Sequence, residues 1–117
     1  MNSIKITDYF LRKLKRANKK HPSIKIALGD LITLLEQDAN IGESLGAGLH
    51  KIRLAVDSKG GKSGEFRLIS YIAQPILDTS NDDSIGYNVW LVELYDKSEI
   101  DSILKSELLK IVRNTID

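Results

Sequence analysis

The apolar residues of this chain change their spacing once, near Gly48, and this change limits what the chain can fold into. Upstream of it, Ile24, Leu28, Leu31 and Leu35, with Ile32, share one face at helical spacing, which predicts an amphipathic helix. Downstream of it, apolar residues alternate with polar ones, as in a strand that buries one face. A helical segment followed by a run of strands predicts the α+β class.

Two helices are predicted in the N-terminal part of the chain. Phe10, Leu14 and Ala17 share one face of the first helix. The His-Pro-Ser turn at residues 21–23 ends this helix, because the residue before a proline is disfavoured in the α conformation. The second helix should end before Gly42, so the two helices form a hairpin.

Three strands and a last helix are predicted downstream. The first strand follows Gly48, the second ends or weakens at Gln74-Pro75, and the third is expected to keep Trp90 and Leu94 on one face. A final amphipathic helix is expected from about residue 103. We therefore predict a single α+β domain over residues 1–117, with two N-terminal helices packed on a small antiparallel sheet and a C-terminal helix.

The alternation also predicts which side chains share the sheet face away from the helices. If the helices cover the face of Ile52, Leu68 and Trp90, the opposite face carries four cations and two tyrosines. A single basic residue on a strand is usually only solvated, but this set lies in register across three strands. The pattern predicts a phosphate-binding surface on an open sheet, formed by Lys51, Arg53, Arg67, Tyr71, Tyr95 and Lys97.

The formal net charge is only +1, but the charges are segregated along the chain. Residues 5–25 hold eight basic residues and one acid, whereas residues 30–47 hold four acids and no base. Such a basic region suits a polyanionic partner. Ordinary solvated helix faces produce the same asymmetry, so charge alone leaves both readings open.

Other features limit the chemistry. The chain has no cysteine and only two histidines, His21 and His50, which excludes thiolate zinc sites and cysteine nucleophiles. We therefore expect no metal and no cofactor. The N-terminus lacks the apolar run of a signal peptide and no stretch is suited to cross a membrane, so we expect a cytoplasmic protein.

Three segments, in this order along the chain, resemble the strand motifs of the RelE and HigB family of bacterial toxin–antitoxin toxins. They are Gly48-Leu49-His50-Lys51-Ile52-Arg53-Leu54, Gly61-Lys62-Ser63-Gly64-Glu65-Phe66-Arg67-Leu68-Ile69 and Val92-Glu93-Leu94-Tyr95-Asp96-Lys97-Ser98-Glu99, and the Lys-His-Pro-Ser turn matches as well. The resemblance implies two N-terminal helices packed on an antiparallel sheet. It also implies a ribosome-dependent endoribonuclease that cuts messenger RNA in the ribosomal A site, inhibits translation and is held inactive by a cognate antitoxin protein.

The same resemblance implies roles for individual residues. Cleavage by the 2′-hydroxyl of RNA needs a general base, cations to stabilise the phosphorane and an acid for the leaving group. Lys51 is the candidate base, because neighbouring cations disfavour a charged ammonium. Arg67 is the main transition-state cation, and Arg53 and Lys97 are phosphate ligands or the acid. Glu65 places a negative charge near this site and would weaken RNA binding.

Further residues are expected to bind RNA without taking part in the chemistry. Tyr71 and Tyr95 are candidates to stack on a base, and the basic first helix is expected to contact ribosomal RNA. The expected RNA-binding set is Lys62, Tyr71, Tyr95, Lys59, Arg12, Lys13 and Arg16. The family also has a ParE-like branch that poisons DNA gyrase. A binding or inhibitory protein without chemistry, gyrase-directed or a degenerate toxin kept as an antitoxin partner, is therefore the alternative.

Overall fold

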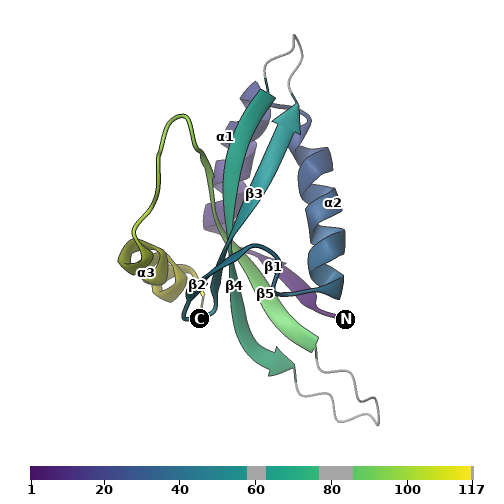
Figure 1. Ribbon diagram of the computed structural model, residues 1–117, viewed down its shortest axis with the longest axis vertical. Helices are drawn as coiled ribbons and strands as arrows, with labels where there is room; N and C mark the ends of the chain where they lie inside the picture. The colour runs from purple at the N-terminus through teal and green to yellow at the C-terminus, as the bar shows by residue number, and fades with distance from the viewer. Residues whose placement is uncertain (58–62, 77–85, 117) are drawn as a thin grey trace.

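The helical half and the alternating half of the sequence form the two kinds of layer of the predicted α+β fold (Figure 1). The computed structural model describes residues 1–57, 63–76 and 86–116. Within these residues lie three helices and a five-stranded sheet. In chain order the elements are β1 (Ser3–Ile6), α1 (Asp8–Lys20), α2 (Ile24–Gln37), β2 (Glu43–Gly46), β3 (Leu49–Asp57), β4 (Ser63–Ile76), β5 (Gly86–Asp96) and α3 (Lys105–Thr115).

The strand order in the sheet is β1-β5-β4-β3-β2. The three long strands β3, β4 and β5 are antiparallel, as predicted, whereas the short edge strand β1 runs parallel to β5. The other edge strand, β2, was not predicted from its sequence. It pairs with β3 through a tight turn in which Ala47 and Gly48 both have positive φ, 54° and 84°. Glycine adopts this conformation without the steric cost of a Cβ atom.

The N-terminal helices cover one face of the sheet, as expected. Thr7 caps α1 by accepting a hydrogen bond from the backbone N–H of Phe10 at 3.0 Å. Four of the five predicted stripe residues of α2 are buried, and the fifth, Ile32, is partly buried against them. They pack with Phe10 and with the sheet residues Ile52 and Leu68 in the main core. The helical hairpin and its core were therefore predicted correctly.

The C-terminal helix α3 packs on the opposite face of the sheet, which the sequence had suggested would be open. Leu108 and Val112 of α3 form a second core with Leu49, Ile69 and Tyr95. Figure 1 shows α3 well separated from α1 and α2. Part of the predicted phosphate-binding surface is therefore covered, and the prediction of an open sheet is wrong for that part.

The prediction that Trp90 and Leu94 share a face is also wrong. The pairing between β4 and β5 shifts: Ile69 is opposite Glu93, but Ser70 is opposite Leu91, which leaves Val92 as an extra residue. Such a bulge breaks the alternation of side chains. Leu94 consequently lies in the main core, while Trp90 packs against the second core on the α3 side.

Strand β4 continues through Gln74-Pro75, where it was predicted to end or weaken, but its pairing is irregular there. A proline is tolerated in a strand where its missing N–H faces no partner strand. The last pair between β3 and β4 is Leu49 with Tyr71, so β4 is paired only with β5 at Pro75, and the register is irregular between Ile72 and Pro75.

No helix in the described part of the chain is both long and apolar enough to cross a membrane.

Candidate functional site

The centre of the candidate site is a row of side chains across three strands. Arg53 of β3 is directly paired with Arg67 of β4, which is directly paired with Tyr95 of β5. Directly paired residues in a sheet share a face and lie close together. The predicted convergence of these residues is therefore confirmed. The side chain of Arg53 is 73% exposed, whereas that of Arg67 is 13% exposed.

A carboxylate lies between the two arginines. Glu65 precedes Arg67 by two residues on β4, so both side chains point to the same face. Its Oε1 atom is 2.6 Å from Nη2 of Arg53 and 3.2 Å from Nη1 of Arg67. Contact with Arg53, and more weakly with Arg67, lowers the pKa of the Glu65 carboxyl group below its usual value. Two like charges on neighbouring strands are thus held together by one shared anion.

Lys51, the predicted general base, lies on the same strand as Arg53 and has an acidic partner. Its Nζ is 3.7 Å from Oε2 of Glu43, its directly paired neighbour on β2. The side chain of Lys51 is about half-buried, and that of Glu43 is exposed. To take a proton from a 2′-hydroxyl, Lys51 must be a neutral amine, and a neutral amine would lose its ionic attraction to Glu43.

Lys97 lies just beyond the end of β5 and not on the strand itself. Its backbone N–H donates a hydrogen bond of 2.9 Å to the carbonyl of Glu65, which fixes it beside the arginine pair. Its side chain is exposed and, within the described residues, makes no ion pair. Lys97 is therefore the one predicted catalytic cation that has no ion-pair partner among the described residues.

The predicted stacking role of Tyr95 does not fit the structure. Tyr95 is only 5% exposed, because Ile69, Val92 and Leu108 belong to the same buried cluster. This burial raises the pKa of the Tyr95 hydroxyl, with Arg67 acting in the opposite direction. The ring has no free face for a base, so the expectation is corrected. Tyr71 is half-buried against the same cluster, and Lys59 and Lys62 lie outside the described residues.

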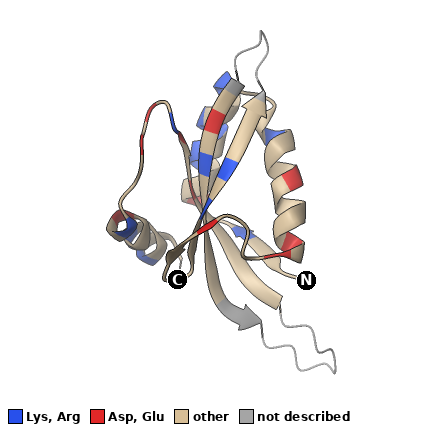
Figure 2. Ribbon diagram, viewed as in Figure 1, with Lys and Arg blue, Asp and Glu red and all other residues tan. Residues whose placement is uncertain are grey.

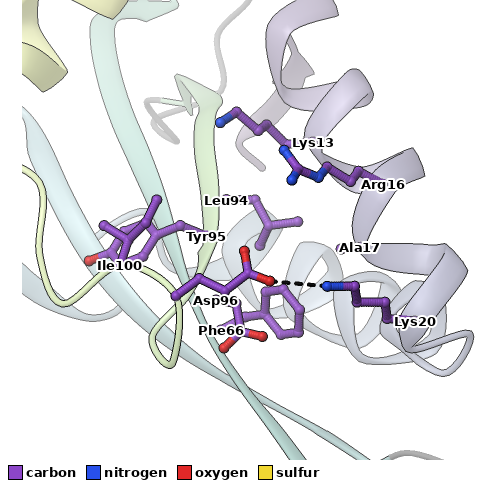
Figure 3. A pocket seen from close by; sticks show the side chains of 10 residues that line it. Lys13, Arg16, Ala17, Lys20, Phe66, Leu94, Tyr95, Asp96 and Ile100 are labelled. Carbon is purple, nitrogen blue, oxygen red and sulfur yellow. Dashed lines mark hydrogen bonds and ion pairs between the residues drawn. The ribbon is translucent and has the colours of Figure 1, made fainter.

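The basic helix α1 packs along the C-terminal part of β5, beyond the residues of β5 that pair with β1. Figure 2 shows blue segments on α1 and on the adjoining halves of β3 and β4. Between α1 and the end of β5 there is a hollow of about 80 Å³, with Phe66 and Leu94 among its lining residues. Lys13, Arg16 and Lys20 of α1 also line it (Figure 3). Nζ of Lys20 lies 3.2 Å from Oε1 of Glu99.

The predicted RNA-contacting cations of α1 differ in their surroundings. Arg12 and Arg16 are exposed and have no ion-pair partner in the described parts of the chain. Lys13 is half-buried; its Nζ is 3.8 Å from Oε1 of Glu93 and lies over the ring of Tyr9. The structure therefore leaves the two arginines free to meet a polyanion and holds Lys13 against the protein.

Glu93 is a buried acid that reasoning from the sequence did not identify. It is 2% exposed, and its Oε2 accepts a hydrogen bond of 2.7 Å from the hydroxyl of Tyr9 on α1. Burial, followed by the hydrogen bond to Glu93, raises the pKa of Tyr9 to about 12. Tyr9 and Lys13 are four residues apart on α1, a spacing that places both on one face of the helix. These contacts attach α1 to β5.

No protein-family model matches this chain, and neither a curated protein nor a solved structure matches it.

Proposed function

We propose that this protein is a metal-independent endoribonuclease that cuts messenger RNA in the ribosomal A site. In this proposal it is the toxin of a toxin–antitoxin pair, acts in the cytoplasm and is neutralised by a cognate antitoxin. The observation that carries the proposal is the pairing of Arg53 with Arg67 around one bound carboxylate. Two guanidinium groups that already hold an anion form a site whose charge and geometry suit a phosphate.

The residues around this pair can supply the other parts of the reaction. Lys51 would take the proton of the 2′-hydroxyl, whose oxygen forms a bond to phosphorus while the bond to the 5′-oxygen breaks. Arg53 and Arg67 would stabilise the charge of the phosphorane. Lys97 would return a proton to the leaving 5′-oxygen, since a lysine can release a proton that a guanidinium retains. The products are a 2′,3′-cyclic phosphate and a 5′-hydroxyl end.

The exposed arginines Arg12 and Arg16 support binding to a large RNA. They lie on α1, the helix that Tyr9 and Lys13 attach to Glu93 of β5, and would contact the backbone of ribosomal RNA while messenger RNA occupies the Arg53–Arg67 site. Orientation of the message by the ribosome would contribute much of the rate, because positioning alone can lower a barrier by about 7 to 11 kcal/mol.

The test is to map messenger RNA ends in a reconstituted translation reaction, with and without ribosomes. Wild-type protein should produce new 5′-hydroxyl ends only with ribosomes. Arg67→Ala should abolish them, because the main transition-state cation is lost. The control is Arg113→Ala, which should cut normally, since Arg113 is exposed on α3 and has no ion pair in the described chain. Circular dichroism would confirm that Arg67→Ala is folded. Normal cutting by folded Arg67→Ala would contradict the proposal.

A second candidate is a binding or inhibitory protein without chemistry, directed at DNA gyrase or retained as an antitoxin partner. The ion pairs that Glu65 and Glu43 make with three of the predicted catalytic cations favour it. Alanine at Lys51, Arg53 and Arg67 separates the two. Growth inhibition that survives all three changes, without RNA cleavage, would support the binding protein, and its loss would support the nuclease.

A further inference from the structure

Glu65 occupies the position between Arg53 and Arg67 that a phosphate oxygen would take. One carboxylate oxygen contacts both guanidinium groups, at 2.6 and 3.2 Å. The two arginines are directly paired on neighbouring strands, so their mutual repulsion favours an anion at this point. Arg67 is largely enclosed, with 13% of its side chain exposed, and has little freedom to meet a ligand elsewhere.

From this geometry we propose that Glu65 is a built-in competitor for the phosphate site and makes binding of free RNA weak. A phosphate can contact both arginines only after the carboxylate moves away. Glu65 is attached to β4 two residues from Arg67, so its effective concentration at the site is high, in the millimolar range or above for short tethers. The apparent affinity for any phosphate is the intrinsic affinity multiplied by the fraction of molecules in which the site is vacant.

The consequence is a dependence on other contacts. RNA that is held only by the Arg53–Arg67 site competes poorly with Glu65. RNA that is already held near the protein, by α1 or by the ribosome, reaches an effective concentration comparable to that of Glu65 and displaces it. Glu65 is therefore a specificity-determining residue: it suppresses reaction with free RNA and allows it with positioned RNA. The identity of the ligand as RNA rests on the proposed nuclease function, whereas the competition of Glu65 for a phosphate does not.

The phosphate site can be tested without any cleavage. Full-length wild-type protein and Glu65→Gln would be titrated with methyl phosphate and with a short single-stranded oligonucleotide of 2′-deoxynucleotides. This oligonucleotide cannot be cut, because it lacks the attacking 2′-hydroxyl. Binding would be followed by the guanidinium Nε–Hε signals of Arg53 and Arg67 in NMR spectra. Glu107→Gln is the control, because this exposed glutamate of α3 has no ion pair in the described residues and its loss changes the net charge equally.

Glu65→Gln should bind both probes about three- to tenfold more tightly than wild type, as the loss of two partly exposed ion pairs implies. Glu107→Gln should bind them as wild type does. Equal affinity of Glu65→Gln and wild type, or an equal gain in Glu107→Gln, would overturn the inference. With natural RNA, Glu65→Gln should also cut free message faster than wild type. If no variant cuts RNA while Glu65→Gln still binds methyl phosphate more tightly, the competitor role stands and the nuclease proposal fails.

Discussion

Arg53 and Arg67 are direct neighbours across β3 and β4, and a single oxygen of Glu65 contacts both. Like charges in directly paired positions destabilise a sheet. The carboxylate converts this repulsive pair into a stable arrangement of two ion pairs. The features that make the pair suited to phosphate also make it dependent on an anion.

Replacement of Glu65 by glutamine should therefore lower stability. The pKa of Glu65 is below its usual value in the folded protein, so its contribution is fully present above the ordinary glutamate pKa near 4.5 and is lost as the pH falls through the lowered value. Urea denaturation of both proteins should show a gap in stability at neutral pH that closes at lower pH. Because the pairs are partly exposed to solvent, the gap should also shrink in high salt. A gap that is independent of pH would contradict the ionic role of Glu65.

Tyr9→Phe should destabilise the protein by about 1 to 3 kcal/mol, because the buried Glu93 carboxylate loses a hydrogen-bond donor. Tyr87→Phe is the matched control, since its hydroxyl makes no hydrogen bond to the described residues, and should change stability little. Chemical denaturation measures both. Equal effects of the two changes would show that the Tyr9 hydroxyl bond contributes nothing specific.

The titration of Tyr9 should also reveal this contact. Its pKa is raised from 10.0 to about 12, so the fold favours the protonated hydroxyl. The corresponding stability is fully present below pH 10 and is lost as the pH rises towards 12. Tyrosinate absorbance should show late titration of Tyr9 and of the buried Tyr95, and only the Tyr9 part should disappear in Tyr9→Phe. A normal titration of every tyrosine would count against the buried contact.

Leu108→Ala should destabilise the protein by about 2 to 5 kcal/mol, because Leu108 anchors α3 in the second core. It should also expose Tyr95, detected as stronger quenching of tyrosine fluorescence by acrylamide. Leu104→Ala is the control: Leu104 is 71% exposed just before α3, and its loss should change stability by less than about 0.5 kcal/mol. Similar losses in both variants would mean that α3 does not depend on this core.

Arg16→Ala should weaken binding to single-stranded RNA and make it less dependent on salt. Each phosphate contact contributes about 0.7 to the slope of log affinity against log salt concentration. Arg16 is exposed on α1 and lines the hollow beside β5, whereas Arg113 is exposed on α3 and serves as the control. Fluorescence anisotropy at several salt concentrations measures the slopes. An unchanged slope in Arg16→Ala would remove α1 from the RNA-binding surface.

Local patterns in the sequence determined the helical hairpin, the three long strands and the placement of Arg53 beside Arg67. Each follows from a spacing of 3.6 or two residues, which the backbone imposes within one element. The stripe of α2 is the clearest case, because four of its five predicted residues lie in the core and the fifth, Ile32, packs against it. When two such strands pair, the side chains that point to the same face of the sheet are brought together.

Only the tertiary structure decided which of these side chains remain available. The bulge between β4 and β5 moved Trp90 away from the face of Leu94, and α3 covered Tyr95. The carboxylate of Glu65 forms ion pairs with both Arg53 and Arg67. Periodicity is a property of one segment, whereas bulges, helix docking and shared ion pairs depend on residues far apart in the chain. The spacing of apolar residues therefore determined the layers, and long-range packing determined the surface on which any chemistry must take place.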